Sequence, residues 1–279
     1  MNNSNIAFII FTLNEEKRIE YPVRNFIKYG EVIVLDGGST DKTGEIAQKY
    51  GAKFLKRPNM GKMCGETPEM LNFVLANTDK KWLFWQYVDD LAPKSLLEKL
   101  AEISCQDKYK KVVIPLYTYL WGKTQYPALK GAVGCFFQRN MVDFSNNKIH
   151  EMGRFLGTDE EVLWLPTCDD FAIRHFSLYN LSKFTTNHLA YAEAEAEQKY
   201  VNGKRYSMIR MLAAMMRYFW LFYRHNWRNG VVGFMTALSY ANFRLLTYFH
   251  LYEKENDVTL ETIEKQFVIE KKKIIDSLD

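Results

Sequence analysis

Carboxylates that directly follow apolar segments are the residues of this sequence best suited to chemistry. Asp36 comes after residues 32–35, and it opens the sequence Asp-Gly-Gly-Ser-Thr-Asp, which ends at Asp41. A buried strand that ends in a tight, glycine-permitted loop brings its carboxylate to the sheet edge where open α/β folds bind ligands. The same residues are also compatible with a plain turn after a core strand. Ser39 and Thr40 are predicted to cap the next helix rather than to contact a substrate.

A second pair of carboxylates, Asp89 and Asp90, follows the apolar and aromatic segment 82–88 and precedes Pro93. Hard oxygen ligands of this kind suit magnesium or manganese bound to phosphates. An aspartate ahead of a helix that starts with proline is also a common capping residue. The pair therefore predicts either a metal site or a helix cap.

Both motifs need strands that end at one edge of a sheet. Short apolar runs alternate with helical patterns over the first hundred residues, which predicts a doubly wound α/β sheet with right-handed crossovers. The predicted strands are residues 6–11, 32–35, 52–55, 82–88, 112–117 and 131–139, and the predicted helices are residues 15–29, 43–50, 70–76 and 93–100.

Composition sets limits on the class of protein. With 279 residues, of which 47% are hydrophobic, the chain can bury one large core with or without an appendage. The net charge of +4 is too small to indicate nucleic-acid binding by the whole protein. The cysteines are widely spaced and no secretory signal precedes the first strand, which predicts a reduced, cytosolic compartment. No apolar run reaches the roughly 20 residues of a spanning helix.

The last third of the chain has a different character. Residues 204–252 contain no acidic residue, and Arg210, Arg217 and Arg224 recur every seven residues among aromatic and methionine side chains. This pattern favours a basic helix in a membrane interface, although helices packed on the protein or on a second subunit would also fit. Gly230 should divide the array into two helices, and the charged tail 261–278 is helical in pattern.

Three motifs in combination resemble the family-2 glycosyltransferases with the GT-A nucleotide-sugar fold: residues 11–17, residues 32–43, and the acidic pair before Pro93. The likeness is greatest to the branch that adds sugars to lipopolysaccharide core or related surface glycans. It implies an inverting transfer from a nucleotide diphosphate sugar to a glycan or glycolipid acceptor. It also implies a divalent cation, Mn²⁺ or Mg²⁺, and a peripheral location on the cytoplasmic face of the inner membrane.

The resemblance assigns roles to particular residues. The nucleoside pocket would be formed by Thr12, Asn14, Glu15, Asp36 and Asp41, with Asp36 contacting the base. The metal would be held by Asp89, with Asp90 second and His175 as a further ligand. The family usually has Asp-x-Asp at this strand end, whereas this chain has Tyr87 or Gln86 in place of the first acid. His175 is equally compatible with a structural place at a strand edge.

The general base implied by the resemblance is Glu151, with His150 beside it to orient or bind. An inverting transfer needs a carboxylate on the acceptor side to take the hydroxyl proton. From the residues alone, Glu151 would be an exposed loop acid and His150 a packed imidazole. Asp170 is the alternative base.

We therefore expect a GT-A-like catalytic domain at residues 1–180 and a helical, membrane-associating extension at residues 181–279. Two other classes compete with a transferase. The altered acidic motif is compatible with a catalytically degenerate protein that binds nucleotide sugars or acts as a scaffold in a glycan assembly complex. The basic, aromatic C-terminal region is compatible with nucleic-acid binding, but no nucleic-acid partner is expected.

Overall fold

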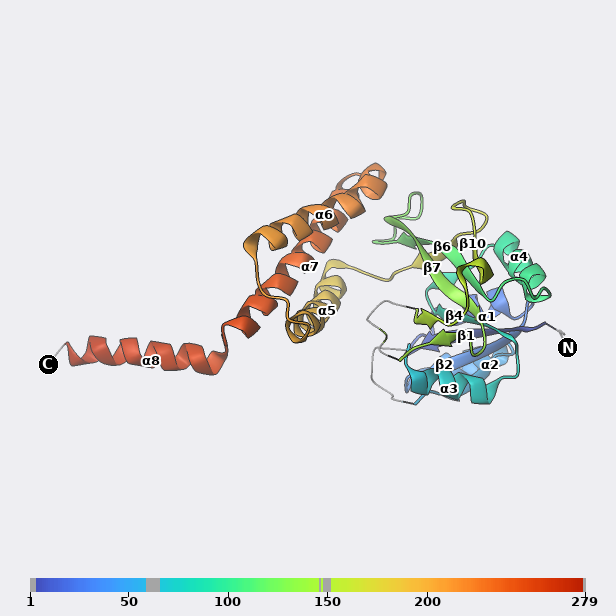
Figure 1. Cartoon of the computed structure of the whole chain (residues 1–279), viewed down its shortest axis with the longest axis horizontal. Helices are drawn as coiled ribbons and strands as arrows, with labels where there is room; N and C mark the ends of the chain where they lie inside the picture. Colours follow the sequence, from blue (N-terminus) through green and yellow to red (C-terminus); the bar gives the residue numbers. More distant parts are fainter. Residues whose placement is uncertain (1–3, 59–65, 146, 148–151, 278–279) are drawn as a thin grey trace. The chain divides into compact units, whose positions relative to one another are not determined.

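The computed structural model describes residues 4–58, 66–145, 147 and 152–277. The chain divides into two compact units (Figure 1). The first comprises Met1–Tyr119 and Lys130–Ser177, and the second comprises Leu120–Leu129 and Leu178–Asp279. The segment 120–129 thus groups with the second unit, although it is flanked in sequence by strands of the first.

A mixed sheet forms the centre of the first unit. Its strand order is β3-β2-β1-β4-β7-β6-β11-β5, and β10 pairs with β6. The strands of this sheet are β1 (Ile6–Thr12), β2 (Glu31–Asp36), β3 (Lys53–Lys56), β4 (Trp82–Tyr87), β5 (Asp90–Leu91), β6 (Lys111–Tyr119), β7 (Leu129–Gln138), β10 (Val162–Trp164) and β11 (Ile173–Phe176), while β8 (Val142–Asp143) and β9 (Arg154–Phe155) form a separate pair.

The parallel half of this sheet, from β3 to β4, positions the residues of interest. All residues of β1 are buried, as expected for a strand covered on both faces. Its parallel register places Thr12 beside Asp36 of β2 and Phe11 beside Tyr87 of β4. The carboxyl ends of three strands therefore meet at one edge, as the sequence predicted.

The other half of the sheet is mixed, because β6 pairs in parallel with β10 and β11. Strand β7 runs antiparallel to β4, and β5 runs antiparallel to β11. The doubly wound prediction is therefore correct only for the first four strands along the chain. The two-residue strand β5 was not predicted, because its residues, Asp90 and Leu91, show no apolar run of their own.

All four helices predicted for the first unit are present, although several of their boundaries differ from the predicted ones. They are α1 (Glu20–Phe26), α2 (Thr43–Lys49), α3 (Pro68–Asn77) and α4 (Lys94–Ser104) (Figure 1). Helix α1 begins at Glu20, five residues later than residue 15, where the pattern predicts it. The backbone N–H groups of residues 14–16 donate to the side chains of Ser39, Thr43 and Asp41.

The second unit is helical. It contains α5 (Leu181–Val201), α6 (Met208–Asn226), the short 3₁₀ helix η2 (Trp227–Asn229), α7 (Val231–Glu255) and α8 (Leu260–Asp276). Helix α7 packs along both α5 and α6 (Figure 1). Gly230 separates α6 from α7 as predicted, and it adopts a φ of 62°, which a residue with a side chain rarely takes.

Among the helices in the described ranges, none combines the length and the apolar character needed to cross a membrane.

Candidate active site at the carboxyl ends of β1, β2 and β4

Asp36 organises the loop that follows β2. Its carboxylate accepts hydrogen bonds from the backbone N–H groups of Gly38 and Ser39, each at 2.9 Å, and from the Ser39 hydroxyl at 2.5 Å. Asp36 is only 1% exposed. The Asp36 carboxylate thus fixes the conformation of this loop. Any contact with a nucleoside base would use the lone pairs that these three donors leave free.

The loop after β2 is tied to the loop after β1 through backbone donors. The N–H of Asn14 donates to the Ser39 hydroxyl at 2.7 Å, and the N–H of Glu15 donates to the Thr43 hydroxyl at 2.7 Å. In return, the Asn14 carboxamide oxygen accepts from the N–H of Thr40 at 2.9 Å. Asn14 has a positive φ of 54°, a conformation that asparagine tolerates better than most residues. Ser39 and Thr40 therefore join two loops, and the prediction that they cap the next helix is wrong.

Asp41 completes this connection and supports the start of α2. One carboxylate oxygen accepts from the N–H of Glu16 at 3.0 Å, and the other accepts from the N–H and the hydroxyl of Thr43. Partial burial acts to raise the pKa of Asp41, but the bonds from Thr43 and Glu16 outweigh it and lower the pKa below its ordinary value.

The lowered pKa of Asp41 predicts a pH-dependent contribution to stability. We expect Asp41→Asn to reduce the free energy of unfolding by about 1 kcal/mol at neutral pH, since it weakens bonds to a charged acceptor. A group with a lowered folded-state pKa stabilises the protein above its unfolded pKa of about 3.9, and the effect is lost as the pH falls through the folded value. Urea unfolding of wild type and variant at several pH values should therefore give curves that converge in acid. A difference that persists at the lowest pH would contradict this account.

Thr12 lies at the end of β1, beside Asp36. It is 6% exposed, and within the described residues its hydroxyl oxygen has no hydrogen-bond partner. Its carbonyl accepts from the N–H of Gly37 at 2.9 Å. A buried hydroxyl without a partner is costly unless a ligand or water completes it, so Thr12 retains bonding capacity at this strand end.

Arg18 joins the first loop to the acidic pair. Its guanidinium donates to both carboxylate oxygens of Glu15, at 2.6 and 2.5 Å, and to Oδ1 of Asp89 at 2.5 Å. The Arg18 and Asp89 side chains are 23% and 21% exposed, so the pair is partly shielded from water. Sequence reasoning missed Arg18. The spacing of three residues from Glu15 would have predicted that contact, but nothing in the sequence predicts a contact across 71 positions.

Asp90 and His175 form a second pair behind Asp89. Oδ1 of Asp90 lies 2.8 Å from Nδ1 of His175, and Oδ2 accepts from the N–H of Tyr87 at 3.0 Å. The antiparallel pairing of β5 with β11 places the two residues opposite each other. Burial acts to lower the pKa of His175. The hydrogen bond to Asp90 and the charge of Asp89 act to raise it and outweigh burial, so the pKa lies above its ordinary value. Burial raises the pKa of Asp89 despite Arg18 and His175.

The donor groups here fit a cation shared with a bound ligand, and they do not fit a cation held by protein side chains alone. Both oxygens of Asp90 are bonded within the protein, and one oxygen of Asp89 faces Arg18. In the part of the chain that the structure describes, no three His, Cys, Asp or Glu side chains are arranged to hold a metal ion. Carboxylates still outnumber the one guanidinium and one imidazole nearby, which favours an added cation.

The predicted residues are thus brought together in two groups. Thr12, Asn14, Glu15, Asp36 and Asp41 lie on the connected loops after β1 and β2, and Asp89, Asp90 and His175 lie beside them where β4, β5 and β11 meet. The predicted base Glu151 and its neighbour His150 lie outside the described residues. The alternative base Asp170 is exposed, and its backbone carbonyl accepts from Ser95 at 2.7 Å.

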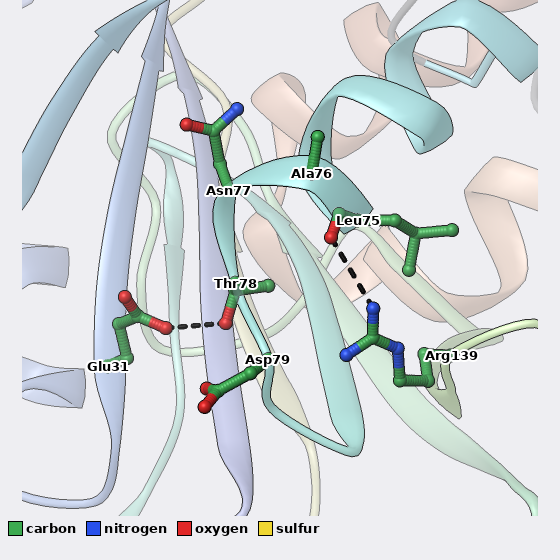
Figure 2. A pocket seen from close by; sticks show the side chains of 7 residues that line it. All are labelled: Glu31, Leu75, Ala76, Asn77, Thr78, Asp79 and Arg139. Atoms are coloured by element: carbon green, nitrogen blue, oxygen red, sulfur yellow. Dashed lines mark hydrogen bonds between the residues drawn. The ribbon is translucent and has the colours of Figure 1, made fainter.

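A surface pocket lies at the opposite edge of the sheet (Figure 2). Its lining residues are Glu31, Leu75, Ala76, Asn77, Thr78, Asp79 and Arg139. Glu31 begins β2 and Thr78 precedes β4, so the pocket is at the amino ends of the parallel strands. Its polar groups bond to one another, with Thr78 donating to Glu31 at 2.5 Å and Arg139 donating to the Leu75 carbonyl at 3.4 Å (Figure 2). Ligands of open α/β sheets bind at the other edge.

Comparison with known proteins is consistent with this arrangement. The lipopolysaccharide core biosynthesis glycosyltransferase LpsC of Rhizobium meliloti is 25% identical over 259 residues, which cover 89% of this chain and 92% of LpsC. An uncharacterized glycosyltransferase of Rickettsia conorii is 26% identical over 260 residues, which cover 89% of this chain and 90% of that protein.

Two solved structures are also similar. S. aureus TarS is 15% identical, with a TM-score of 0.46 over 67% of this chain and 39% of TarS. Glucosyl-3-phosphoglycerate synthase of Mycobacterium tuberculosis, solved with Mn²⁺, UDP and glucosyl-3-phosphoglycerate, is 24% identical, with a TM-score of 0.31 over 42% of this chain and 45% of the synthase.

A family model decides the assignment. The model described as glycosyl transferase family 2 matches residues 7–165, which is more than half of the chain. The matched range contains the carboxyl ends of β1, β2 and β4 and the acidic pair, and therefore the strand ends that form the candidate site. It confirms the family that the motifs resemble, and the mixed α/β sheet is GT-A-like. The protein belongs to glycosyl transferase family 2 and is a glycosyltransferase.

Proposed function

We propose that this protein transfers a sugar, with inversion, from a nucleotide diphosphate sugar to a glycan or glycolipid acceptor in the synthesis of lipopolysaccharide or another cell-surface polysaccharide. The observation that carries the proposal is the pair of connected loops after β1 and β2, with the buried Thr12 hydroxyl left without a partner in the described residues. The relative named for lipopolysaccharide core biosynthesis supports the choice of pathway.

The nucleoside half of the donor would bind over these two loops. Thr12, Asn14, Glu15, Asp36 and Asp41 are the residues proposed for it. Asn14 is exposed on the loop surface, and the buried Thr12 hydroxyl has no hydrogen-bond partner within the described residues. A site that satisfies the imide and hydroxyl groups of a nucleoside discriminates against analogues that lack them, because its own polar groups would then be unpaired.

The chemical step needs a base on the acceptor side, and we assign this role to Glu151 with His150 orienting it. Glu151 would take the proton of the acceptor hydroxyl while the hydroxyl oxygen forms a bond to the anomeric carbon. The bond from that carbon to the diphosphate oxygen breaks, and the diphosphate leaves with the electron pair. Attack and departure on opposite faces of the sugar invert the anomeric centre.

The negative charge that develops on the leaving diphosphate must be stabilised, and we propose that a cation bound at the acidic pair does this. We assign Asp89 as the main protein ligand of a divalent cation that arrives with the donor, whose phosphate oxygens supply most of the other ligands. Asp90 and His175, which bond to each other, are the second and third candidates. Asp89 would hold the cation, which would supply positive charge to the leaving diphosphate, and the Arg18 guanidinium, which donates to Asp89, adds a fixed positive charge there.

Residues 1–180 are the proposed catalytic domain and residues 181–279 the helical extension. We place the enzyme on the cytoplasmic face of the inner membrane, held there peripherally by its C-terminal helices. Support comes from the absence of acidic residues between Lys204 and Tyr252 and from the large apolar side chains exposed on α6 and α7.

A thermal-shift screen with nucleoside diphosphates and their sugars tests the donor site. A ligand that binds only the folded state raises the apparent stability, by about 2.7 kcal/mol at a hundred times its Kd. We expect one nucleotide series to raise the Tm, and manganese to enlarge the shift. In Asp89→Ala, the nucleotide should still raise the Tm and the added effect of manganese should disappear. A shift equal with and without manganese in both proteins would remove Asp89 as a metal ligand, and no shift with any nucleotide would contradict the donor site.

A further inference from the structure

One face of α6 exposes a continuous row of apolar side chains. Ile209, Leu212, Met216 and Trp220 are 81%, 50%, 58% and 55% exposed, and Trp227 of η2 is 55% exposed. Their spacing of three or four residues up to Trp220 places the helical members on one side of α6. The opposite side of α6 is the one that packs. Met211 and Phe222 are buried there, and Phe222 stacks on Tyr240 of α7 at 3.6 Å. Membrane insertion by Met211 or Phe222 is thereby excluded, and the exposed row is left unpacked.

The exposed row continues onto the beginning of α7. Val231, Phe234, Met235 and Leu238 are between 42% and 75% exposed. The Phe234 ring lies 5.7 Å from that of Phe219 and 6.4 Å from that of Tyr223, both on α6. We call these exposed residues of α6, η2 and α7 the apolar surface. All of its residues belong to one unit of the protein, and the ring contacts of Phe234 join its α6 and α7 parts.

Arginines border the apolar surface. Arg210, Arg217 and Arg224 lie seven residues apart, one position after Ile209, Met216 and Tyr223, and Arg228 follows Trp227. All four are exposed, and no ion pair involves them within the described residues. With no acidic residue from Lys204 to Tyr252, their positive charge is not offset locally.

We infer that the apolar surface is a bilayer-binding face that lies flat in the interface of an anionic membrane. Its side chains would enter the boundary of headgroups and acyl chains, and the four arginines would contact lipid phosphates. Charge decides against a second copy of this chain as the occupant, because two such faces would bring like charges together. It is less suited to nucleic acid, since six of its nine side chains are isoleucine, leucine, valine or methionine and offer bases no ring on which to stack.

This inference rests on the proposed placement of the enzyme at a membrane and specifies the face that binds. Flotation of the full-length protein with vesicles at about 0.15 M salt tests it. We expect binding to vesicles of phosphatidylglycerol mixed with phosphatidylcholine, and much weaker binding to phosphatidylcholine alone. The variant Arg217→Gln/Arg224→Gln should lose about 25-fold in partition coefficient, at about fivefold for each arginine. The variant Met216→Ser/Trp220→Ser should lose about tenfold or more.

A matched control removes the same charge elsewhere. Arg24→Gln/Lys94→Gln changes two exposed cations of the first unit, and it should bind vesicles as the wild type does. The inference is overturned if the wild type does not bind anionic vesicles, if the control loses as much as Arg217→Gln/Arg224→Gln, or if Met216→Ser/Trp220→Ser binds undiminished while abolishing self-association. Nucleotide-induced thermal shifts on the same proteins separate the two proposals, because donor binding needs no vesicle.

Discussion

Glu151→Gln is expected to reduce kcat for sugar transfer by about 10²–10⁴-fold, which is the usual contribution of a general base. The amide has nearly the shape of the carboxylate but cannot accept the hydroxyl proton. Binding of the nucleotide sugar should be unchanged, since the donor loops after β1 and β2 are separate from this residue in the proposal. Single-turnover transfer to an acceptor and thermal shift with the donor measure the two quantities.

Asp170→Asn is the matched control for this experiment. Asp170 is the alternative base, and its side chain is exposed near the start of β11. Its variant should retain transfer activity within about twofold, because a substitution of an exposed side chain away from packed or hydrogen-bonded groups rarely has a larger effect. If Asp170→Asn loses activity and Glu151→Gln keeps it, the two roles are exchanged. If both variants transfer at the wild-type rate, neither residue is the base.

Asp36→Asn is expected to lower the free energy of unfolding by about 2–4 kcal/mol, because the buried carboxylate accepts three hydrogen bonds and the amide reverses one acceptor into a donor. The N–H groups of Gly38 and Ser39 already share one carboxylate oxygen, so the amide nitrogen of the variant would take the place of the other oxygen and could no longer accept from the Ser39 hydroxyl. The loop that these bonds shape forms half of the donor site, so the affinity for nucleotide should fall by about tenfold or more.

Glu31→Gln provides a control on the same strand. Glu31 begins β2, at the end remote from Asp36, and it accepts a hydrogen bond from Thr78. Its variant should bind nucleotide with unchanged affinity, measured by calorimetry, whatever its effect on stability. An Asp36→Asn protein that is folded at the assay temperature and binds nucleotide as tightly as the wild type would contradict the role given to the loop.

The parallel half of the fold could be predicted from sequence because each strand is a local signal. The apolar runs that became β1, β2 and β4 are continuous, and each ends in a polar residue at the sheet edge. The family resemblance implied that Thr12 and Asp36 share a pocket, and the register of β1 and β2 places the two residues side by side. In contrast, β5 has two residues and depends on pairing with β11, more than eighty positions later. No local pattern specifies such a strand.

The same distinction applies to the site. The sequence identified Asp89, Asp90 and His175 as candidates by type, but the bonds that engage them come from distant residues. Arg18 bonds to Asp89, and His175 bonds to Asp90. These contacts depend on tertiary structure, and they engage the side chains that the sequence offered as metal ligands. The sequence also did not predict which face of α6 is exposed. Periodicity shows that side chains of one kind share a face of the helix, but it does not show which face α7 covers.

Three of the hydrogen bonds between the loops after β1 and β2 run in the same direction, with a practical consequence for protein engineering. Residues 14–16 supply backbone N–H groups, whereas Ser39, Asp41 and Thr43 supply side-chain acceptors. A library that varies the side chains of Glu15 and Glu16 leaves these three bonds in place, provided proline is omitted. A library at Ser39, Asp41 or Thr43 removes them. Attempts to redirect sugar-nucleotide preference should therefore diversify the first loop and keep the second constant.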